Sequence, residues 1–402
     1  FPIFLYSKFN YKILMKKKII ILGSTGSIGT TLIDIIKKNQ NKFEVKLLTA
    51  NKNTKLLLKQ AKLLKVKNIV ITNDKEFKKV TFKNKNKELK IFNNFNFLDK
   101  ILNSKVDYTM SSISGLAGLE PTLKMIKYTK TIAIANKEAI ICGWDLINNK
   151  IKKHKTNFIP VDSEHFSIWY ALKNNFDKIE KIYLTASGGP FNKMSVKKFK
   201  NINIKQALKH PNWKMGKKIS IDSATMMNKV FEIIEAKNIF NVNYKKLSIL
   251  IHPKSYIHAI VKFNNGMTKI IAHDTSMKIP ILNSLNLNSD VLIKSKKLNL
   301  MILNNLDFQH VDKNKFPVVN ILKEVPKSSS LFETLIVSAN DELVELFLNK
   351  RIQFVDIYKK LSKLISLNEF QQYKKIKVKK LNSIIQLDKY VRSKIKSDYK
   401  AI

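Results

Sequence analysis

The sequence has 402 residues, and 44% of them are hydrophobic, which is enough to bury the cores of two or three domains. Its formal net charge of +44 would suggest a nucleic-acid or membrane partner. However, only Arg351 and Arg392 are arginines, the lysines are spread along the whole chain, and no apolar run reaches the roughly 18 residues of a membrane span. A/T-rich codons explain the excess of Lys, Ile and Asn. We expect a solvated lysine surface that attracts phosphates, no nucleic-acid partner and no membrane partner.

The segment 1–14 lacks the basic-then-apolar order and the cleavage site of a secretory signal. Because a predicted strand follows Met15 directly, we treat residues 1–14 as extraneous or disordered and suspect Met15 as the true start. The single cysteine, Cys142, cannot form an internal disulfide, which favours a reducing compartment. We therefore expect a cytoplasmic, bacterial protein, and a plastid stroma remains open.

An alternation of strands and helices predicts a fold of the α/β class with a Rossmann-like dinucleotide-binding domain over residues 15–150. The predicted strands lie at 18–22, 43–49, 67–72, 107–119 (ending in a small-residue loop) and 131–136. They indicate a largely parallel sheet.

The character of the sequence changes after about residue 150. The expected parts are a central α+β catalytic domain at 151–299, a polar, loop-like linker at 300–327, and a C-terminal helical bundle at 328–402. The elements expected in the central part are an extended acidic segment at 157–165, a helix from about Ser223 to Asn238 and two strands within 247–263. Apolar residues at three- and four-residue spacing indicate the helices of the bundle.

The loop Gly23–Gly29 reads GSTGSIG and lies between a predicted strand and a predicted helix. Glycines let the backbone approach a pyrophosphate, which the free N–H groups of the helix N-terminus bind. A structural turn is the alternative. After the second strand, Asn51, Lys52 and Asn53 offer a cation and amides where NAD-binding folds usually place a carboxylate. This segment favours NADP, whose 2′-phosphate attracts positive charge.

Asp162 and Glu164 are candidates for a metal site. At i and i+2 on an extended segment, their carboxylates would point the same way and repel each other without a cation. Oxygen ligands alone suit Mg²⁺ or Mn²⁺. A solvated acidic turn is the alternative, which the scarcity of acidic pairs in so basic a chain weakens. His165 is a weaker candidate, either structural or in support of a metal ligand.

The predicted helix from Ser223 places Asn228, Lys229 and Glu232 close together near its start. A lysine, an amide and a serine hydroxyl suit a phosphate, and the glutamate could complete a metal site. The alternative is a surface ion pair between Lys229 and Glu232 on an ordinary helix.

Two loops are further candidates for the substrate site. His210–Gly216 contains Trp213 and Met215, and it could close over a substrate, or its tryptophan could anchor the loop in the core. Ser187 begins a small-residue loop that could offer a hydroxyl and N–H groups to a phosphate, or could be an ordinary tight turn.

Together these segments resemble the 1-deoxy-D-xylulose 5-phosphate reductoisomerase family of non-mevalonate isoprenoid biosynthesis. The matching stretches are GSTGSIG (23–29), ANKE (135–138), PVDSEH (160–165), SGGPF (187–191), HPNWKMGKKISIDSATMMNK (210–229) and IHP (251–253). The resemblance implies a small phosphorylated substrate, which is rearranged to an aldehyde that NADPH reduces to 2-C-methyl-D-erythritol 4-phosphate. It also implies a homodimer, and Mn²⁺ or Mg²⁺ acting as a Lewis acid on the substrate carbonyl.

The resemblance also implies roles for individual residues. The implied metal ligands are Asp162, Glu164 and Glu232. The implied substrate contacts, several of them around the phosphate, are Lys137, Ser163, Ser187, Ser223, Asn228 and Lys229, with His210 and Trp213 in a flexible flap. The implied NADPH-binding positions are Thr25, Gly26, Ser27, Ile28, Asn51 (where the family often has Gly), Lys52, Asn53, Asn136, Glu138 and Gly216.

Val230, Lys254 and Ser276 depart from the family pattern, but none of them removes a metal or phosphate ligand. They therefore bear on catalytic efficiency. The rival enzyme class is a plain NADP-dependent dehydrogenase, for example of a semialdehyde, which would not need the carboxylate set. The rival non-enzyme class is a decayed homologue that binds nucleic acid, which would be expected to lose ligands such as Glu232 first.

Overall fold

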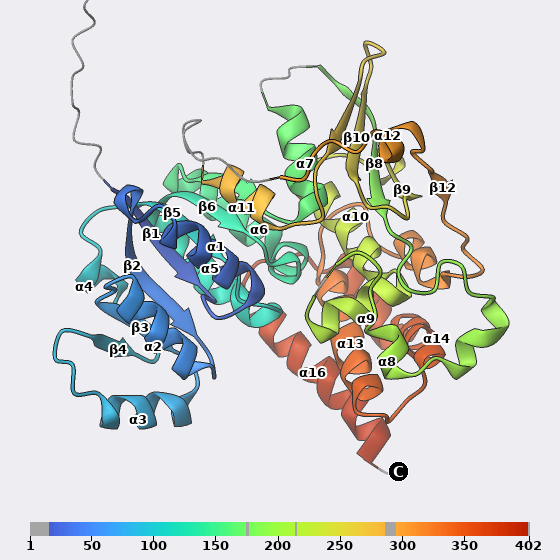
Figure 1. The fold of residues 1–402 in the computed structure, drawn as a ribbon. Helices are drawn as coiled ribbons and strands as arrows, with labels where there is room; N and C mark the ends of the chain where they lie inside the picture. Colours follow the sequence, from blue (N-terminus) through green and yellow to red (C-terminus); the bar gives the residue numbers. More distant parts are fainter. Residues whose placement is uncertain (1–15, 174–176, 214, 286–294, 401–402) are drawn as a thin grey trace, which may run out of the picture.

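The computed structural model describes residues 16–173, 177–213, 215–285 and 295–400. The predictions for residues 1–14 and for Met15 lie outside the described residues. The described chain forms an N-terminal α/β part, a central sheet with its helices, and a C-terminal group of helices (Figure 1). In these ranges, no helix combines the length and the apolar character that crossing a membrane requires.

The N-terminal part contains a seven-stranded sheet in which all neighbouring strands are parallel. Its strands are β1 (Lys17–Leu22), β2 (Phe43–Ala50), β3 (Asn68–Ile71), β4 (Lys90–Phe92), β5 (Val106–Ser111), β6 (Thr129–Ile134) and β7 (Asn157–Pro160). Its helices are α1 (Ser27–Lys37), α2 (Thr54–Leu63), α3 (Asp74–Lys83), α4 (Leu98–Ile101), α5 (Leu119–Met125) and α6 (Lys137–His154). The order β4-β3-β2-β1-β5-β6-β7 reverses between β1 and β5, where open α/β sheets bind their ligands. The Rossmann-like prediction is confirmed, although β7 lies beyond the predicted boundary at residue 150.

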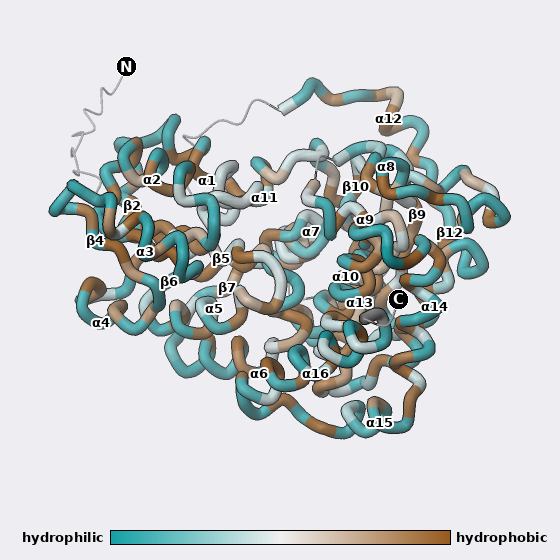
Figure 2. The backbone as a smooth tube through the Cα atoms, turned by 90° about the horizontal axis from the view of Figure 1, so that it is seen from below, coloured by the Kyte–Doolittle hydropathy of each residue, from teal (hydrophilic) through white to brown (hydrophobic). Residues whose placement is uncertain are grey.

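Both faces of this sheet are buried, as a parallel sheet covered by helices on both sides requires. Along β1, Ile19 and Ile21 pack into a cluster with α1 and α2, whereas Ile20 and Leu22 pack into a cluster with α5 and α6. The second cluster continues into the C-terminal helices, so the sheet and these helices share one core. Along the helices in Figure 2, hydrophobic and hydrophilic stretches alternate, as expected for helices with one buried face.

The central part contains a five-stranded sheet in the order β11-β10-β8-β9-β12. Its strands are β8 (Ile179–Ala186), β9 (Leu247–Ile251), β10 (Ile257–Phe263), β11 (Thr268–Ala272) and β12 (Gln309–His310). The helices are α7 (Ser163–Leu172), α8 (Ile204–Ala207), α9 (Lys217–Thr225), α10 (Met227–Phe240), α11 (Lys278–Ser284) and α12 (Leu300–Asn304). The pair β8 and β9 is parallel, and the other pairs are antiparallel. The two strands predicted within 247–263 are β9 and β10.

The prediction of one extended acidic segment at 157–165 is wrong. Strand β7 ends at Pro160, and α7 begins at Ser163 with Asp162 as its N-cap. The Asp162 side chain accepts a hydrogen bond from the Glu164 backbone N–H at 3.4 Å, and an aspartate in this position favours a helix start. The two carboxylates are therefore neighbours on a helix turn rather than on one face of a strand.

The prediction of one helix from Ser223 to Asn238 is also wrong, because Met226 separates α9 from α10. Met226 has a left-handed backbone with φ 69°, which costs a non-glycine residue roughly 1–2 kcal/mol. It is 2% exposed, so the surrounding core must hold it in this conformation. The turn lets Ser223 at the end of α9 and Asn228 at the start of α10 face the same cavity.

The interpretation of residues 300–325 as a polar loop is wrong, because α12 and β12 lie in the first half of this range and a buried 3₁₀ helix lies in the second half. The 3₁₀ helix η6 (Pro317–Lys323) buries Val318, Val319 and Ile321 and packs against α10. The sequence there is NKFPVVNILK. Polar and apolar residues follow one another within one short helix, so their spacing does not indicate which face is buried.

The helical C-terminal region is confirmed. Its helices are α13 (Leu331–Leu348), α14 (Phe354–Ile365), α15 (Asn368–Gln371) and α16 (Leu381–Lys400). Helix α13 packs against α14, α16 and α6, which ties this region to the N-terminal part. The remaining single turns of 3₁₀ helix are η1 (Gln40–Lys42), η2 (Leu116–Gly118), η3 (Ile126–Tyr128), η4 (Val196–Asn201), η5 (Tyr244–Lys246) and η7 (Gln372–Lys375).

Glu333, in the first turn of α13, should make stability depend on pH. Its Oε2 accepts hydrogen bonds from the Ser330 N–H (3.0 Å) and hydroxyl (2.6 Å), which closes a capping box. The side chain is buried, and burial raises the pKa of Glu333 from 4.5 to about 7. The folded chain thus holds this proton more tightly than the unfolded chain. The stabilisation that the protonated Glu333 side chain contributes is complete below about pH 4.5 and is lost as the pH rises through about 7.

Glu333→Gln keeps an acceptor for the capping box and removes the ionisation. We expect the free energy of unfolding of this variant to exceed that of the wild type by about 3 kcal/mol at about pH 8, and to approach it near pH 4.5. Urea unfolding at the two pH values measures the difference. A difference that does not change with pH would contradict the assignment.

Candidate active site

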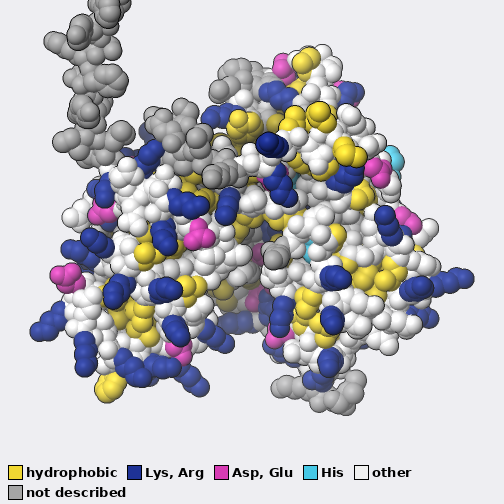
Figure 3. Space-filling view, viewed as in Figure 1, with side chains coloured by type: hydrophobic (Ala, Val, Ile, Leu, Met, Phe, Trp, Pro, Cys, Tyr) yellow, Lys and Arg dark blue, Asp and Glu magenta, His cyan; other side chains and the backbone are white. Residues whose placement is uncertain are grey.

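A cavity of about 710 Å³ opens where the carboxyl ends of β1 and β5 face the central part. In Figure 3 the visible face is hollowed between its two halves, and lysine side chains are scattered over the surface on both sides. The predicted site residues that line the cavity are Gly26, Ser27, Ile28, Asn136, Lys137, Glu138, Asp162, Ser163, Glu164, Ser187, His210, Trp213, Gly216, Ser223, Asn228, Lys229 and Glu232. Segments far apart in the sequence therefore meet around one space.

The three carboxylates proposed as metal ligands come together at the centre of this cavity. Asp162 and Glu164 lie at the start of α7, and Glu232 lies on α10, which packs against α7. One oxygen of each carboxylate lies within 4.8 Å of the others. Three hard oxygen donors at this separation, two of them from one helix turn, fit a divalent cation such as Mg²⁺ or Mn²⁺.

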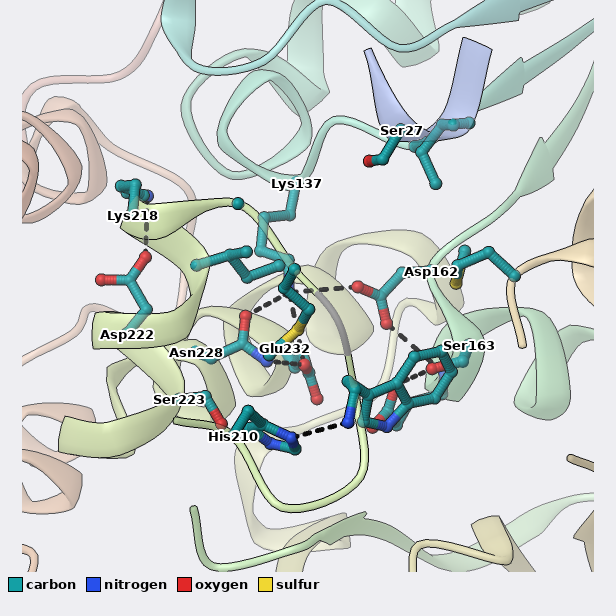
Figure 4. Close-up of a pocket in the computed structure, with 18 of the residues that line it drawn as sticks. Ser27, Lys137, Asp162, Ser163, His210, Lys218, Asp222, Ser223, Asn228 and Glu232 are labelled. Atoms are coloured by element: carbon teal, nitrogen blue, oxygen red, sulfur yellow. Dashed lines mark hydrogen bonds and ion pairs between the residues drawn. The ribbon is translucent and has the colours of Figure 1, made fainter. Parts of the chain in front are cut away.

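Two lysines neutralise part of this acidic cluster. Lys137 Nζ lies 3.0 Å from Asp162 Oδ2 and 3.3 Å from Glu232 Oε1. Lys229 Nζ lies 2.8 Å from Glu164 Oε1, forms an ion pair with Glu232 and donates to the Thr185 carbonyl at 2.6 Å. Both lysines are nearly fully buried, so their charges are held here by the carboxylates. Figure 4 shows Lys137 reaching from one side toward Asp162 and Asn228.

The electrostatics of the cluster separates its members. Burial alone would raise the pKa of Asp162, but the Lys137 ammonium together with His165 and the Glu164 N–H outweighs burial and holds this pKa well below its ordinary value. Burial and the neighbouring Glu232 charge raise the pKa of Glu164 to about 7. The cluster thus contains three carboxylates and two lysine ammonium groups. A bound cation would stabilise the negative charge that the two lysines do not balance.

His210 is held as a neutral imidazole in a defined tautomer. Its Nδ1 accepts hydrogen bonds from the backbone N–H groups of Asn212 (3.1 Å) and Trp213 (2.9 Å), so Nε2 carries the proton. That N–H faces Ser187 Oγ at 3.1 Å. Burial and Lys229 lower the pKa of His210 to about 4. The indole of Trp213 is half-buried against His258, with ring centroids 6.1 Å apart, so this residue both lines the cavity and packs.

The β1–α1 loop forms the opposite end of the cavity. A Cβ on Gly23 (φ 81°) would lie 2.8 Å from the Ser112 carbonyl oxygen, and one on Gly29 would lie 2.4 Å from the Gly23 oxygen, so both glycines are required. Helix α1 begins after Gly26 without a side-chain cap, which leaves its first N–H groups available to an anion. In Figure 4, Ser27 lies apart from His210 and Ser223, with Asp162 and Glu232 between them.

Two predicted cofactor residues of the cavity wall already have partners. The Asn136 amide caps α6 by accepting from the Ala139 N–H at 2.9 Å, and it donates to the Gly115 carbonyl at 2.7 Å. Glu138 forms an ion pair of 2.6 Å with Lys218. These side chains shape the wall, and neither projects freely into the space.

Four predicted cofactor residues are outside the set that lines the cavity: Thr25, Asn51, Lys52 and Asn53. Thr25 lies in the β1–α1 loop beside it, and residues 51–53 follow β2 at the surface. There Asn51 donates to Thr72 Oγ1 at 2.9 Å, and Asn53 caps α2 by accepting from the Leu56 N–H at 3.3 Å. Lys52 is exposed at the same sheet edge as the loop.

Sequence reasoning missed Glu235, which is 1% exposed and follows Glu232 by one helical turn on α10. It faces His165, which is completely buried. A second acid at i+3, among the apolar residues at the middle of this helix, was the available signal. Of the three departures from the family pattern, Val230 packs in the core, Lys254 is exposed and Ser276 is half-buried, and none of them blocks the cavity.

Comparisons with known proteins agree with this geometry. Three family models match the chain: 1-deoxy-D-xylulose 5-phosphate reductoisomerase over residues 19–143, and two of its C-terminal domains over residues 158–240 and 274–394. The 1-deoxy-D-xylulose 5-phosphate reductoisomerase of Pelagibacter ubique is 59% identical over 384 residues, which are 95% of this chain and 99% of that protein. The chain belongs to this family.

The enzyme structure from Zymomonas mobilis in complex with NADPH matches with a TM-score of 0.84 and 31% identity, covering 96% of this chain and all of that one. A family structure in complex with NADPH, fosmidomycin and magnesium matches with a TM-score of 0.85 and 31% identity, covering 96% of this chain and 98% of that one.

Proposed function

We propose that this chain converts 1-deoxy-D-xylulose 5-phosphate to 2-C-methyl-D-erythritol 4-phosphate, using NADPH and a divalent metal ion. The observation that carries this proposal is the meeting of Asp162, Glu164 and Glu232 in one cavity with the β1–α1 loop. A plain dehydrogenase needs the loop but not the carboxylate set. Family membership and the relatives' complexes with NADPH and magnesium support the same cofactors for this chain.

The metal would be held by Asp162, Glu164 and Glu232. When bound there, it supplies Lewis-acid polarisation of the substrate carbonyl, which promotes the rearrangement to the aldehyde. Lys137 reaches the same point from α6, and its ammonium can donate a hydrogen bond to a substrate oxygen. The Ser163 hydroxyl, which donates to Glu164 Oε2 at 2.6 Å, lies on the same side of the cluster.

The substrate phosphate would be bound at the end of the cavity formed by Ser187, Ser223, Asn228 and Lys229. These residues offer two hydroxyls, an amide and an ammonium group, which suit phosphate oxygens. Because His210 is neutral and its Nδ1 fixes the backbone of the Trp213 segment, we propose that it organises this wall of the substrate site. Trp213 would shield the reacting carbons from water.

NADPH would lie with its pyrophosphate on the α1 N-terminus, at Gly26, Ser27 and Ile28. We propose the remaining contacts at Thr25, Asn51, Lys52, Asn53, Asn136, Glu138 and Gly216, with the Lys52 charge favouring the 2′-phosphate. NADPH supplies the hydride to the aldehyde carbon, and the aldehyde oxygen takes up a proton, which gives the alcohol.

We further propose a homodimer, the use of either Mn²⁺ or Mg²⁺, and a bacterial cytoplasm as the compartment. The edge strand β11 exposes Ile270, with Met267 beside it, which supports association through this edge. The functional parts proposed are the cofactor domain at 15–150, the catalytic domain at 151–299, the linker at 300–327 and the bundle at 328–402.

The purified chain should oxidise NADPH only when both 1-deoxy-D-xylulose 5-phosphate and Mg²⁺ or Mn²⁺ are present. Loss of absorbance at the nicotinamide band measures this, with reactions that omit the metal or the substrate as controls. Protein that binds both cofactors and still causes no absorbance loss would exclude the proposed activity. Oxidation of NADPH that requires a semialdehyde but no metal ion would favour the rival interpretation as a plain dehydrogenase.

A further inference from the structure

A buried histidine and a buried glutamate lie directly behind the carboxylate cluster, and no step of the reaction described above uses them. His165, in the first turn of α7, is completely buried, and Glu235 on α10 is 1% exposed. The His165 ring is roughly parallel to Phe240, at 10° and with ring centroids 6.4 Å apart, which restricts its orientation. Burying two ionisable groups is costly unless they are paired, so their mutual arrangement needs an explanation.

The contacts of His165 define where its protons are. Nε2 lies 2.9 Å from the backbone carbonyl oxygen of Glu232, which can only accept, so Nε2 carries a hydrogen. Nδ1 lies 3.4 Å from Asp162 Oδ1 and 3.4 Å from Glu235 Oε2. Nδ1 therefore faces Asp162 at the start of α7 and Glu235 on α10, while Nε2 holds the backbone of Glu232.

This position is enclosed behind the cluster, because His165 and Glu235 are buried and neither lines the cavity. Asp162 Oδ1 faces the His165 ring. The other oxygen, Oδ2, is the one that faces Lys137 and the cavity. The same ring holds the backbone of Glu232 through its carbonyl group. One histidine thus connects the two helices that carry the proposed metal ligands.

We infer that Glu235 is a positioning residue, which holds His165 so that Asp162 and Glu232 present their oxygens to the metal in the correct orientation. This inference rests on the proposed function, because it assumes that Asp162 and Glu232 bind the metal. Partners that orient a ligand in this way typically change metal affinity by 10–100-fold when they are removed. Glu235 itself does not line the cavity and is not expected to touch the substrate.

The test measures Mn²⁺ binding by electron paramagnetic resonance of the free ion, without NADPH or substrate. We expect Glu235→Gln to weaken Mn²⁺ binding by at least about tenfold while the affinity for NADPH is unchanged. We expect His165→Gln to have a similar effect. The double variant should bind little worse than either single variant, because both changes break one chain of contacts. Additive losses in the double variant would overturn the inference.

Glu333→Gln is the matched control, because it removes the charge of another buried glutamate that lies outside the cavity. It should bind Mn²⁺ as the wild type does. Wild-type affinity in both Glu235→Gln and His165→Gln, with binding abolished in Asp162→Asn, would overturn this inference and leave the proposed function intact. Two Mn²⁺ ions per wild-type chain would overturn it as well, because a second ion would then separate Asp162, His165 and Glu235. If Asp162→Asn bound Mn²⁺ normally, the proposed metal site itself would fail.

Discussion

Glu232→Gln should abolish turnover while NADPH still binds. Glu232 is 1% exposed and contributes one of the three carboxylates, and its oxygens are shared with Lys137, Asn228 and Lys229. An amide in this position removes one negative charge from the ligand set and faces two lysines with a partly positive group. Because Lewis-acid stabilisation is worth several kcal/mol, kcat should fall at least about a thousandfold.

Cofactor binding should survive, because the α1 N-terminus and Glu232 lie at different places in the cavity (Figure 4). Steady-state oxidation of NADPH and a fluorescence titration of NADPH measure the two properties separately. Glu333→Gln is the matched control, since it makes the same chemical change at a buried glutamate outside the cavity, and it should turn over at the wild-type rate. If Glu232→Gln turned over at the wild-type rate, another residue would have to hold the metal.

The cofactor end of the molecule could be predicted from the sequence because its signals are local. The strand ending at Leu22, the loop Gly23–Gly29 and helix α1 follow one another within a few turns of chain, and each has its own residue preference. The glycine requirement at Gly23 and Gly29 arises from contacts within this unit and with the neighbouring β5–α5 loop. Fold class in this part therefore followed from pattern alone.

The three carboxylates predicted as metal ligands do come together, but the reason from spacing was wrong. Asp162 caps a helix that Ser163 begins, so the two carboxylates meet across a turn and not along a strand. Nothing in the spacing of Glu232 says that α10 packs beside α7; only the resemblance over residues 210–229 suggested it. Such proximity depends on the packing of elements distant in sequence, which local patterns do not encode.

Met226 and Glu235 show two further limits. A left-handed methionine has no local signature, because the surrounding core imposes it at an energetic cost. In the sequence alone, Glu235 cannot be distinguished from a surface glutamate, because its contact with His165 forms only in the folded chain. Both residues obtain their roles from tertiary contacts, and these are the places where sequence reasoning is expected to fail.

Lys218→Met should clearly destabilise the fold. Lys218 Nζ lies 2.6 Å from Glu138, 2.9 Å from Asp222 and 2.9 Å from Asp341, which belong to three different helices: α6, α9 and α13. Burial alone would lower the pKa of Lys218, but Asp222, Glu138 and Asp341 outweigh it and raise this pKa well above its ordinary value. The ammonium thus joins the N-terminal part, the end of the His210–Gly216 loop and the C-terminal helices.

Removing the Lys218 charge would leave the carboxylates of Glu138, Asp222 and Asp341 facing one another. Of these three, Arg392 pairs with Asp341 alone, at 3.0 Å. Breaking a fully buried charge network costs about 3–5 kcal/mol, but Lys218 is 31% exposed and water screens part of its charge. We therefore expect the free energy of unfolding to fall by less than this near neutral pH, but by more than a surface pair costs. The loss should shrink in acid, where protonation removes the repulsion. Adding Asp341→Asn should recover part of the loss, because it removes one of the three charges that repel one another.

Lys262→Met provides the matched control, because Lys262 pairs with Glu180 at 2.8 Å on the surface, with both side chains more than 40% exposed. Exposed pairs of this kind contribute less than about 1 kcal/mol. Urea unfolding of both variants, with and without Asp341→Asn, measures the contrast. Equal, small effects would mean that water screens the Lys218 cluster as it screens a surface pair. A large loss that Asp341→Asn does not relieve would mean that Lys218 stabilises the fold through the packing of its alkyl chain rather than its charge.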